Sequence, residues 1–89
     1  MTYRLPIDGV LDLHAFAPRD VRSVVDEYVR AAAEAGLPEI RIVHGRGRGV
    51  QRGIVQAALD RHSLVREFRD APESHLGATI VTLGTVPHR

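Results

Sequence analysis

The chain contains no cysteine, no tryptophan and no lysine. Without cysteine it can form no disulfide, and it offers no thiolate as a nucleophile or metal ligand. Without lysine it can neither form a Schiff base nor complete a P-loop, whose lysine contacts the nucleotide phosphates. All 12 basic residues are therefore arginine, a usage that a GC-rich genome also produces. These absences leave arginine, histidine and carboxylates to carry any chemistry.

Long apolar runs are also missing. No stretch approaches the roughly 20 apolar residues that a membrane-spanning helix needs, and residues 1–6 lack the apolar core of a signal peptide. With 89 residues, of which 44% are hydrophobic, the composition predicts one small globular domain. We expect a cytoplasmic protein with no membrane partner, because the lack of cysteine fits a reducing compartment.

Apolar patterns along the chain predict alternating strands and helices. Residues 10–14 alternate, which predicts a strand with Leu11 and Leu13 on one face and Asp12 and His14 on the other. A helix should follow from about residue 18 and end at Gly36. Its core-facing stripe consists of Val21, Val24, Val25, Tyr28, Val29 and Ala32. Further strands are expected over residues 39–43, 65–69 and 78–83, with a second helix over residues 50–62 whose apolar side is Ile54, Ala57, Ala58 and Leu59.

The order β-α-β-α-β-β predicts a two-layer α/β sandwich with a mixed four-stranded sheet. Strand–helix–strand connections are nearly always right-handed crossovers, so the first two strands should be parallel. Both helices should pack on one face of the sheet. His14 and His44 then lie at the carboxyl ends of parallel strands, which is the edge where open α/β sheets usually bind ligands.

A glycine-rich loop lies between the second strand and the second helix. Glycine lets the backbone turn sharply and approach a ligand closely, and the start of a helix offers unpaired N–H groups. Arginine adds a fork of donors that suits phosphate. No acidic residue occurs from residue 40 to residue 59, so the loop favours a phosphate site over a tight turn with solvated arginines. The candidate phosphate-binding residues are His44, Gly45, Arg46, Gly47, Arg48, Gly49 and Arg52.

Asp12 and His14 are the candidate catalytic residues. A carboxylate beside an imidazole can orient the ring and stabilise its charged form, which suits general acid and base catalysis. The alternative is a polar pair that only caps the neighbouring helix. The remaining histidines are scattered, so the sequence indicates no zinc site. A magnesium ion held by Asp12 and a substrate phosphate stays open as an alternative.

These motifs together resemble the small MutS-related (Smr) domain family. The sequence Leu11-Asp12-Leu13-His14 is similar to the family's LDLHG motif on its first strand. The sequence His44-Gly45-Arg46-Gly47 is similar to the HGxG motif after its second strand. Residues 77–83 also resemble the family's last strand. The resemblance covers residues 8–84, which we expect to form the domain, with residues 1–7 and 85–89 as terminal extensions.

The resemblance implies a fold like that of the C-terminal domain of bacterial translation initiation factor 3. It also implies nucleic-acid binding, often with endonuclease activity on DNA or RNA, in a setting such as the ribosome or the repair machinery. Asp12 and His14 match positions implicated in cleavage, and His44, Gly45 and Gly47 match positions implicated in substrate binding. The glycine that follows LDLH in the family is Ala15 here, which disfavours a left-handed backbone and adds a methyl group.

Three function classes follow from these features. The first is an endonuclease, in which the 2′-OH of RNA is the nucleophile or, for DNA, a magnesium or manganese ion assists water. The second is a DNA- or RNA-binding module without cleavage activity. The third is a binder of a small phosphorylated molecule or nucleotide.

Overall fold

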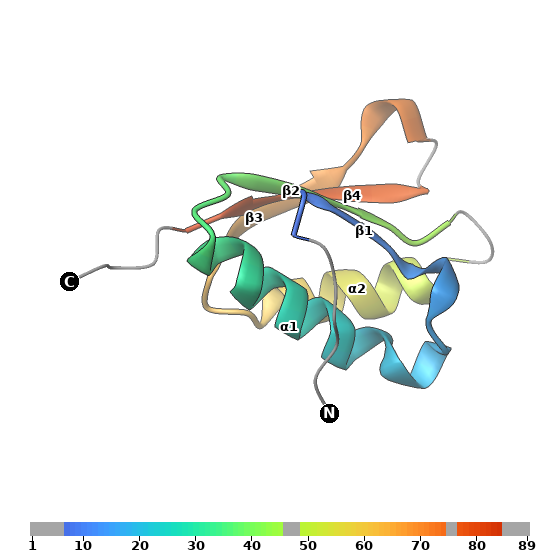
Figure 1. Ribbon diagram of the computed structural model, residues 1–89. Helices are drawn as coiled ribbons and strands as arrows, with labels where there is room; N and C mark the ends of the chain where they lie inside the picture. The colour runs from blue at the N-terminus through green and yellow to red at the C-terminus, as the bar shows by residue number, and fades with distance from the viewer. Residues whose placement is uncertain (1–6, 46–48, 75–76, 85–89) are drawn as a thin grey trace.

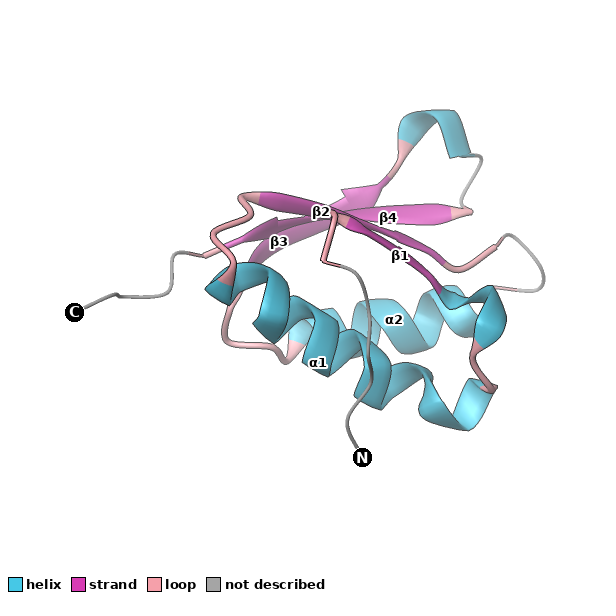
Figure 2. Ribbon diagram, viewed as in Figure 1, coloured by secondary structure: helices cyan, strands magenta, loops and turns pink. Residues whose placement is uncertain are grey.

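Two helices cover one face of a four-stranded sheet in this protein (Figure 1). The structure is a computed structural model that describes residues 7–45, 49–74 and 77–84. Within those ranges no helix is both long and apolar enough to cross a bilayer. The two layers stand out when the ribbon is coloured by secondary structure (Figure 2). The predicted two-layer α/β class is therefore confirmed.

The sheet is mixed, as predicted. Strand β1 (Val10–Asp12) runs parallel to β2 (Glu39–Val43). Strand β4 (Ala78–Leu83) lies antiparallel to β2 on its other side, and β3 (Val65–Asp70) adds antiparallel to β4. The strand order is β1-β2-β4-β3, so the two parallel strands end side by side. That edge carries the residues that the sequence singled out.

Helix α1 (Val21–Glu34) follows the predicted stripe, and every residue of that stripe is buried. The helix ends where the sequence placed its end, because Gly36 adopts φ 83°. The N–H groups of Gly36 and Leu37 donate to the carbonyls of Ala33 and Ala32, each at 3.0 Å. This pair of hydrogen bonds forms a Schellman motif, which satisfies two carbonyls at the helix end.

Helix α2 (Val50–Asp60) is shorter than predicted, and its apolar side was partly wrong. Val55 and Leu59 are its buried residues, whereas Ala57 is exposed. Each residue advances about 100° around a helix, so Ala57 lies roughly opposite Val55. Ile54 is partly buried against the core, as predicted. The inward face of α2 is therefore centred on Val55 and Leu59, with Ile54 beside it.

The first strand also ends earlier than predicted. It stops at Asp12, and Leu13–Ala15 form a single 3-10 turn, η1, before a second such turn, η2 (Pro18–Asp20), leads into α1. The Asp12 carboxylate accepts the backbone N–H of His14 at 2.9 Å, which favours the turn over an extended strand. Ala15 lies in this right-handed turn, so the expected conflict with a left-handed backbone does not arise.

Candidate functional site

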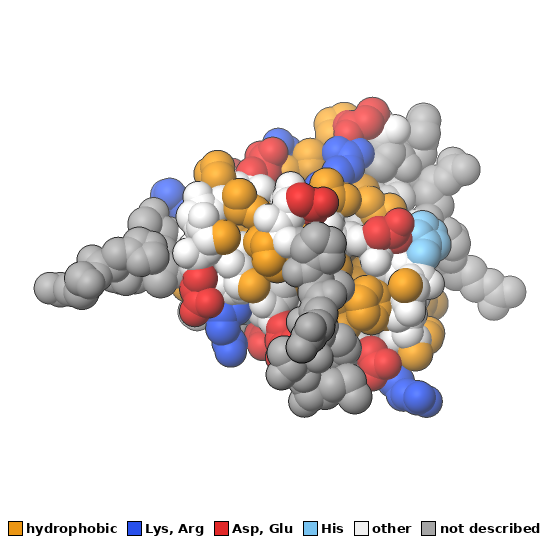
Figure 3. Space-filling model, in the orientation of Figure 1, with side chains coloured by type: hydrophobic (Ala, Val, Ile, Leu, Met, Phe, Trp, Pro, Cys, Tyr) orange, Lys and Arg blue, Asp and Glu red, His pale blue; other side chains and the backbone are white. Residues whose placement is uncertain are grey.

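The carboxyl end of β1 presents an aspartate–histidine pair at the surface. His14 Nδ1 lies 2.6 Å from Asp12 Oδ1. A carboxylate oxygen only accepts, so the proton of the ring is on Nδ1, and Nε2 of the neutral ring keeps its lone pair. The side chains of His14 and Asp12 are 71% and 62% exposed, so a large substrate can reach them. A histidine beside a carboxylate is visible at the surface in Figure 3.

Asp12 stays ionised in this arrangement. The pKa of Asp12 is lowered from its ordinary 3.8, mainly by the hydrogen bond from the backbone N–H of His14 and next by the hydrogen bond from the His14 ring. An ionised carboxylate can orient the imidazole and stabilise its protonated form. The sequence predicted this pair from strand alternation, but the 3-10 turn brings the two groups together. Asp12 also caps that 3-10 turn, whereas the alternative of capping the neighbouring helix is not seen, because no side chain of the described residues caps α1.

The start of the glycine loop lies next to His14. Gly45 follows the end of β2 with φ 80°, and a Cβ at this position would lie 3.7 Å from His14 Nε2. The backbone N–H groups of His44 and Gly45 both donate to the Gly77 carbonyl, at 3.1 and 2.9 Å. The loop therefore begins from a fixed point beside β4. The structure brings Asp12, His14 and Gly45 together, as their positions at the ends of parallel strands predict.

The far end of the loop leads directly into α2. Gly49 is the N-cap residue with φ 80°, no side chain of the described residues caps this end, and the first turn of α2 carries no acidic residue. Its N–H groups can therefore bind an anion. Three predicted phosphate-binding residues, Arg46, Gly47 and Arg48, lie outside the described residues.

The structure gives His44 a different place from the one predicted. Its side chain is buried, with 5% of the residue exposed. Nδ1 lies 3.0 Å from the Gly45 carbonyl, an acceptor, so Nδ1 donates there. Nε2 then accepts the hydroxyl proton of Thr79 at 2.9 Å. Both ring nitrogens have partners within the protein, and these hydrogen bonds link the start of the loop to β4.

A chain of hydrogen bonds extends from His44 to Arg52. Gln56 Nε2 donates to Thr79 Oγ1 at 3.3 Å and to Asp70 Oδ1 at 3.1 Å. Arg52 donates to both oxygens of Asp70, at 2.8 and 2.7 Å. These hydrogen bonds from Arg52 are the main cause that lowers the pKa of Asp70. We call Thr79, Gln56 and Asp70, with His44 and Arg52, the buried-histidine network.

Sequence reasoning missed three members of this network. Thr79 is fully buried in β4, in which all other residues except Thr82 are apolar. A polar residue in such a strand was the available signal, because a buried hydroxyl requires a partner. Nothing in the local sequence links Gln56 or Asp70 to His44. Arg52, predicted to bind phosphate, has its guanidinium committed to Asp70.

The arginine-bearing segment from residue 40 to residue 59 is less positive in space than in sequence. Arg41 pairs with Glu73, and Arg52 pairs with Asp70. Both acids come from outside the segment. Figure 3 shows acidic and basic side chains interspersed over one face of the molecule. The predicted positive patch therefore depends on Arg46 and Arg48.

The described residues hold no group of three or more histidine, aspartate or glutamate side chains that could bind a metal ion. Asp12 is the carboxylate beside His14. Magnesium prefers oxygen ligands and usually keeps several waters. A divalent cation at this edge would thus be held by Asp12 together with oxygens of the substrate.

Comparisons with known proteins agree with this fold. Residues 11–84 match the model of the Smr domain. Endonuclease MutS2 of Caldicellulosiruptor saccharolyticus is 38% identical over 79 residues, which cover 86% of this chain and 10% of that protein. Endonuclease MutS2 of Thermomicrobium roseum is 43% identical over 61 residues, which cover 66% of this chain and 8% of that protein. The chain thus spans about a tenth of the length of these relatives.

Two solved structures have the same fold. The Smr domain of Thermus thermophilus MutS2 aligns with a TM-score of 0.78 at 33% identity, covering 83% of this chain and 95% of that chain. YdaL, a stand-alone small MutS-related protein from Escherichia coli, aligns with a TM-score of 0.80 at 26% identity, covering 90% of this chain and 67% of that chain.

Proposed function

Because the chain belongs to the Smr domain family, we propose that it binds nucleic acid and cleaves phosphodiester bonds beside Asp12 and His14. One observation carries this proposal. The His14 ring is held at Nδ1 by the Asp12 carboxylate, and its other nitrogen, Nε2, lies beside Gly45 at the start of the glycine loop. That is the arrangement of a general base next to a phosphate site.

The chemistry for RNA follows from this arrangement. His14 Nε2 removes the proton of a 2′-OH, and the resulting oxygen attacks the adjacent phosphorus. The bond between phosphorus and the 5′ oxygen breaks, and the leaving oxygen takes a proton from the imidazolium or from water. Asp12 stabilises the imidazolium between these steps. For DNA, His14 instead removes a proton from water, whose oxygen attacks the phosphorus; the bond between phosphorus and one sugar oxygen breaks, and that oxygen takes a proton from the imidazolium or from water. A cation held by Asp12 would stabilise the negative charge on the phosphate.

The phosphate backbone would be held by the glycine loop. The uncapped N–H groups at the start of α2 would bind a phosphate oxygen, and Arg46 and Arg48 would add positive charge. Gly47 allows close approach of the substrate. Arg52 bonds Asp70 through Nε and one terminal nitrogen, so its remaining N–H groups would contribute to phosphate binding. The proposal also includes a domain that spans residues 8–84 and a cytoplasmic location. The setting it proposes is the ribosome or the repair machinery.

A second candidate, nucleic-acid binding without cleavage, is favoured by Ala15. This exposed residue follows His14 directly, and its methyl group stands where the family motif has only a hydrogen. Substrate binding through the loop would survive such crowding. The same crowding would displace the scissile phosphate from His14.

Incubation of the chain with end-labelled single-stranded RNA, duplex DNA and branched DNA separates the two candidates. Each substrate is tested with magnesium, with manganese and with EDTA. We expect cleavage of at least one substrate. Binding of all three with no product in any condition supports the second candidate. Absence of both binding and cleavage contradicts the proposed function.

The pair Asp12→Asn and Asp8→Asn tests the role of the carboxylate. Asp8 Oδ1 accepts the Val10 N–H at 3.1 Å, just as Asp12 accepts that of His14, but Asp8 touches no histidine among the described residues. Asp12→Asn should lower the cleavage rate by roughly 10²–10⁴-fold, because the amide no longer stabilises the imidazolium. Asp8→Asn should cleave like the wild type. Equal rates for the two variants would remove Asp12 from the mechanism.

A further inference from the structure

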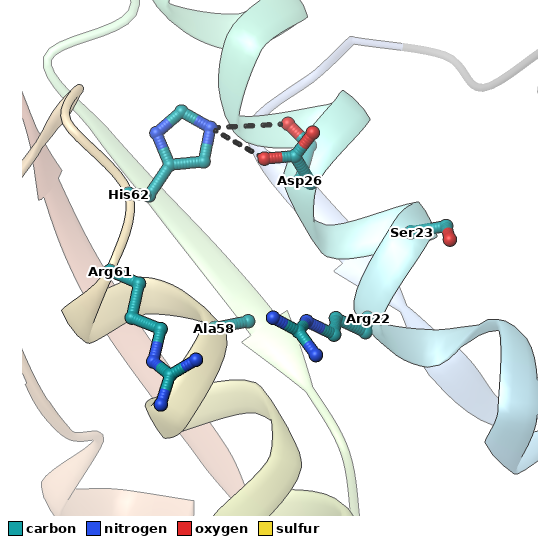
Figure 4. A pocket seen from close by; sticks show the side chains of 6 residues that line it. All are labelled: Arg22, Ser23, Asp26, Ala58, Arg61 and His62. Carbon is teal, nitrogen blue, oxygen red and sulfur yellow. Dashed lines mark hydrogen bonds and ion pairs between the residues drawn. The ribbon is translucent and has the colours of Figure 1, made fainter.

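A second anion site is suggested by the groove between α1 and α2, on the helical layer. The groove has a volume of about 360 Å³ and is lined by Arg22, Ser23, Asp26, Ala58, Arg61 and His62. Figure 4 shows Arg22 extending from α1 toward Ala58, with Arg61 on the α2 side. Two guanidinium groups, from elements far apart in sequence, thus line one hollow.

The carboxylate in this groove has partners other than Arg22 and Arg61. Asp26 Oδ1 lies 3.2 Å from His62 Nε2, and Asp26 Oδ2 lies 3.4 Å from the Arg30 guanidinium. His62 Nδ1 accepts the Leu64 N–H at 3.1 Å, so the ring proton is on Nε2 and points to Asp26. Asp26 is therefore satisfied without Arg22 or Arg61.

Neither arginine has an ion pair with any described residue, unlike Arg30, Arg41, Arg52 and Arg69. Two like charges beside one hollow repel each other, and an anion between them relieves that repulsion. Each guanidinium presents a planar fork of donors that fits phosphate oxygens. The Ser23 hydroxyl adds a further donor at the rim.

We infer that this groove binds a phosphate of the nucleic-acid backbone, at a second contact away from His14. The inference rests on the proposed function for its ligand. Arg22 is in the first turn of α1, and α1 begins at the end of the sheet where β1 stops (Figure 1). A strand or a second arm of a substrate that leaves the His14 edge can pass onto the helical layer there. The inferred contact widens the footprint and does not take part in the chemistry.

The test measures the salt dependence of binding by fluorescence anisotropy. The variants are Arg22→Gln, Arg61→Gln and the double variant, and Arg66→Gln is the matched control. Arg66 is also exposed and without an ion pair among the described residues, but it does not line the groove. Each groove variant should lower the slope of log affinity against log salt by about 0.7–0.9, and the double variant by about twice that. Arg66→Gln should leave the slope unchanged.

A second arm uses pyrophosphate alone, followed through the arginine Nε signals by NMR. Saturable shifts at Arg22 and Arg61 are expected. If the wild type binds nucleic acid and the double variant has the same slope of log affinity against log salt, the inference is wrong. The proposed function is not affected by that result. Shifts with pyrophosphate but unchanged slopes mean that the groove takes a free phosphate compound, which also overturns it. A wild type that binds no nucleic acid overturns both proposals.

Discussion

His14 and His44 lie at the ends of neighbouring parallel strands, yet the two rings differ in exposure and in their hydrogen bonds. The side chain of His14 is 71% exposed, and its Nε2 has no hydrogen-bond partner among the described residues. Only 5% of His44 is exposed, and both its ring nitrogens have partners. Both rings lie next to Gly45, His14 through Nε2 and His44 through Nδ1. The exposed ring is accessible to a substrate, whereas the buried ring is held by its hydrogen bonds.

This difference shows that what a histidine of a sequence motif can do depends on the residues around it in the fold. His14 has its single partner two residues away, so its pairing is local. His44 has a partner 35 residues away in β4, and the chain of hydrogen bonds behind it reaches Arg52. A buried polar network of this kind is rigid when every member is satisfied. We therefore expect activity to depend on one histidine and stability on the other.

Exchanging each histidine for alanine should separate these roles. His14→Ala should lower the cleavage rate by roughly 10²–10⁴-fold, and its free energy of unfolding should stay within about 0.5 kcal/mol of the wild-type value. His44→Ala should cost about 1–3 kcal/mol, because Thr79 loses a buried partner. Cleavage assays and thermal melts of both variants check this. If His14→Ala cleaves at the wild-type rate, His14 is not the general base.

Replacing Gly45, beside the exposed His14, allows a sharper comparison with a second glycine of the same backbone conformation, Gly36. Gly45→Ala and Gly36→Ala both force alanine into a left-handed conformation, at φ 80° and 83°, which should cost each about 1–2 kcal/mol. Only the new methyl at position 45 would lie beside His14 Nε2, 3.7 Å away; around position 36 there is open space.

Cleavage by Gly45→Ala should therefore fall roughly tenfold to a hundredfold, while Gly36→Ala keeps the wild-type rate at temperatures where it is folded. Rates measured beside thermal melts check this pair. Equal rates in the two variants would mean that the space between Gly45 and His14 is not used by the substrate.

The sequence alone predicts the features that depend on near neighbours. The α1 stripe was predicted because its apolar residues recur at the helical period, and Gly36 because helix ends favour glycine. The end of β1 was missed because the side chain of Asp12 competes for a backbone N–H. The burial of His44 and the pairing of Arg52 depend on Thr79 and Asp70, which only the fold brings close.

The weakest expected effect concerns the far end of the buried-histidine network. Arg52 lowers the pKa of Asp70 below 3.8 in the folded protein. A carboxylate with a lowered folded pKa stabilises the fold above its unfolded pKa and loses that contribution as the pH falls through the folded pKa. Asp70→Asn should therefore melt a few degrees below the wild type at neutral pH, and this difference should close as the pH falls below about 3.8.

Thermal melts between about pH 2 and pH 7 measure this difference, with Asp60→Asn as the control. Asp60 is exposed and has no ion pair with the described residues, so its replacement removes a carboxylate without breaking an ion pair. The pair Asp12–His14 is exposed, so Asp12→Asn should change the melting temperature far less than Asp70→Asn at neutral pH. A larger shift for Asp12→Asn would reverse the contrast between the two regions, because it would place the structural ion pair at the exposed histidine.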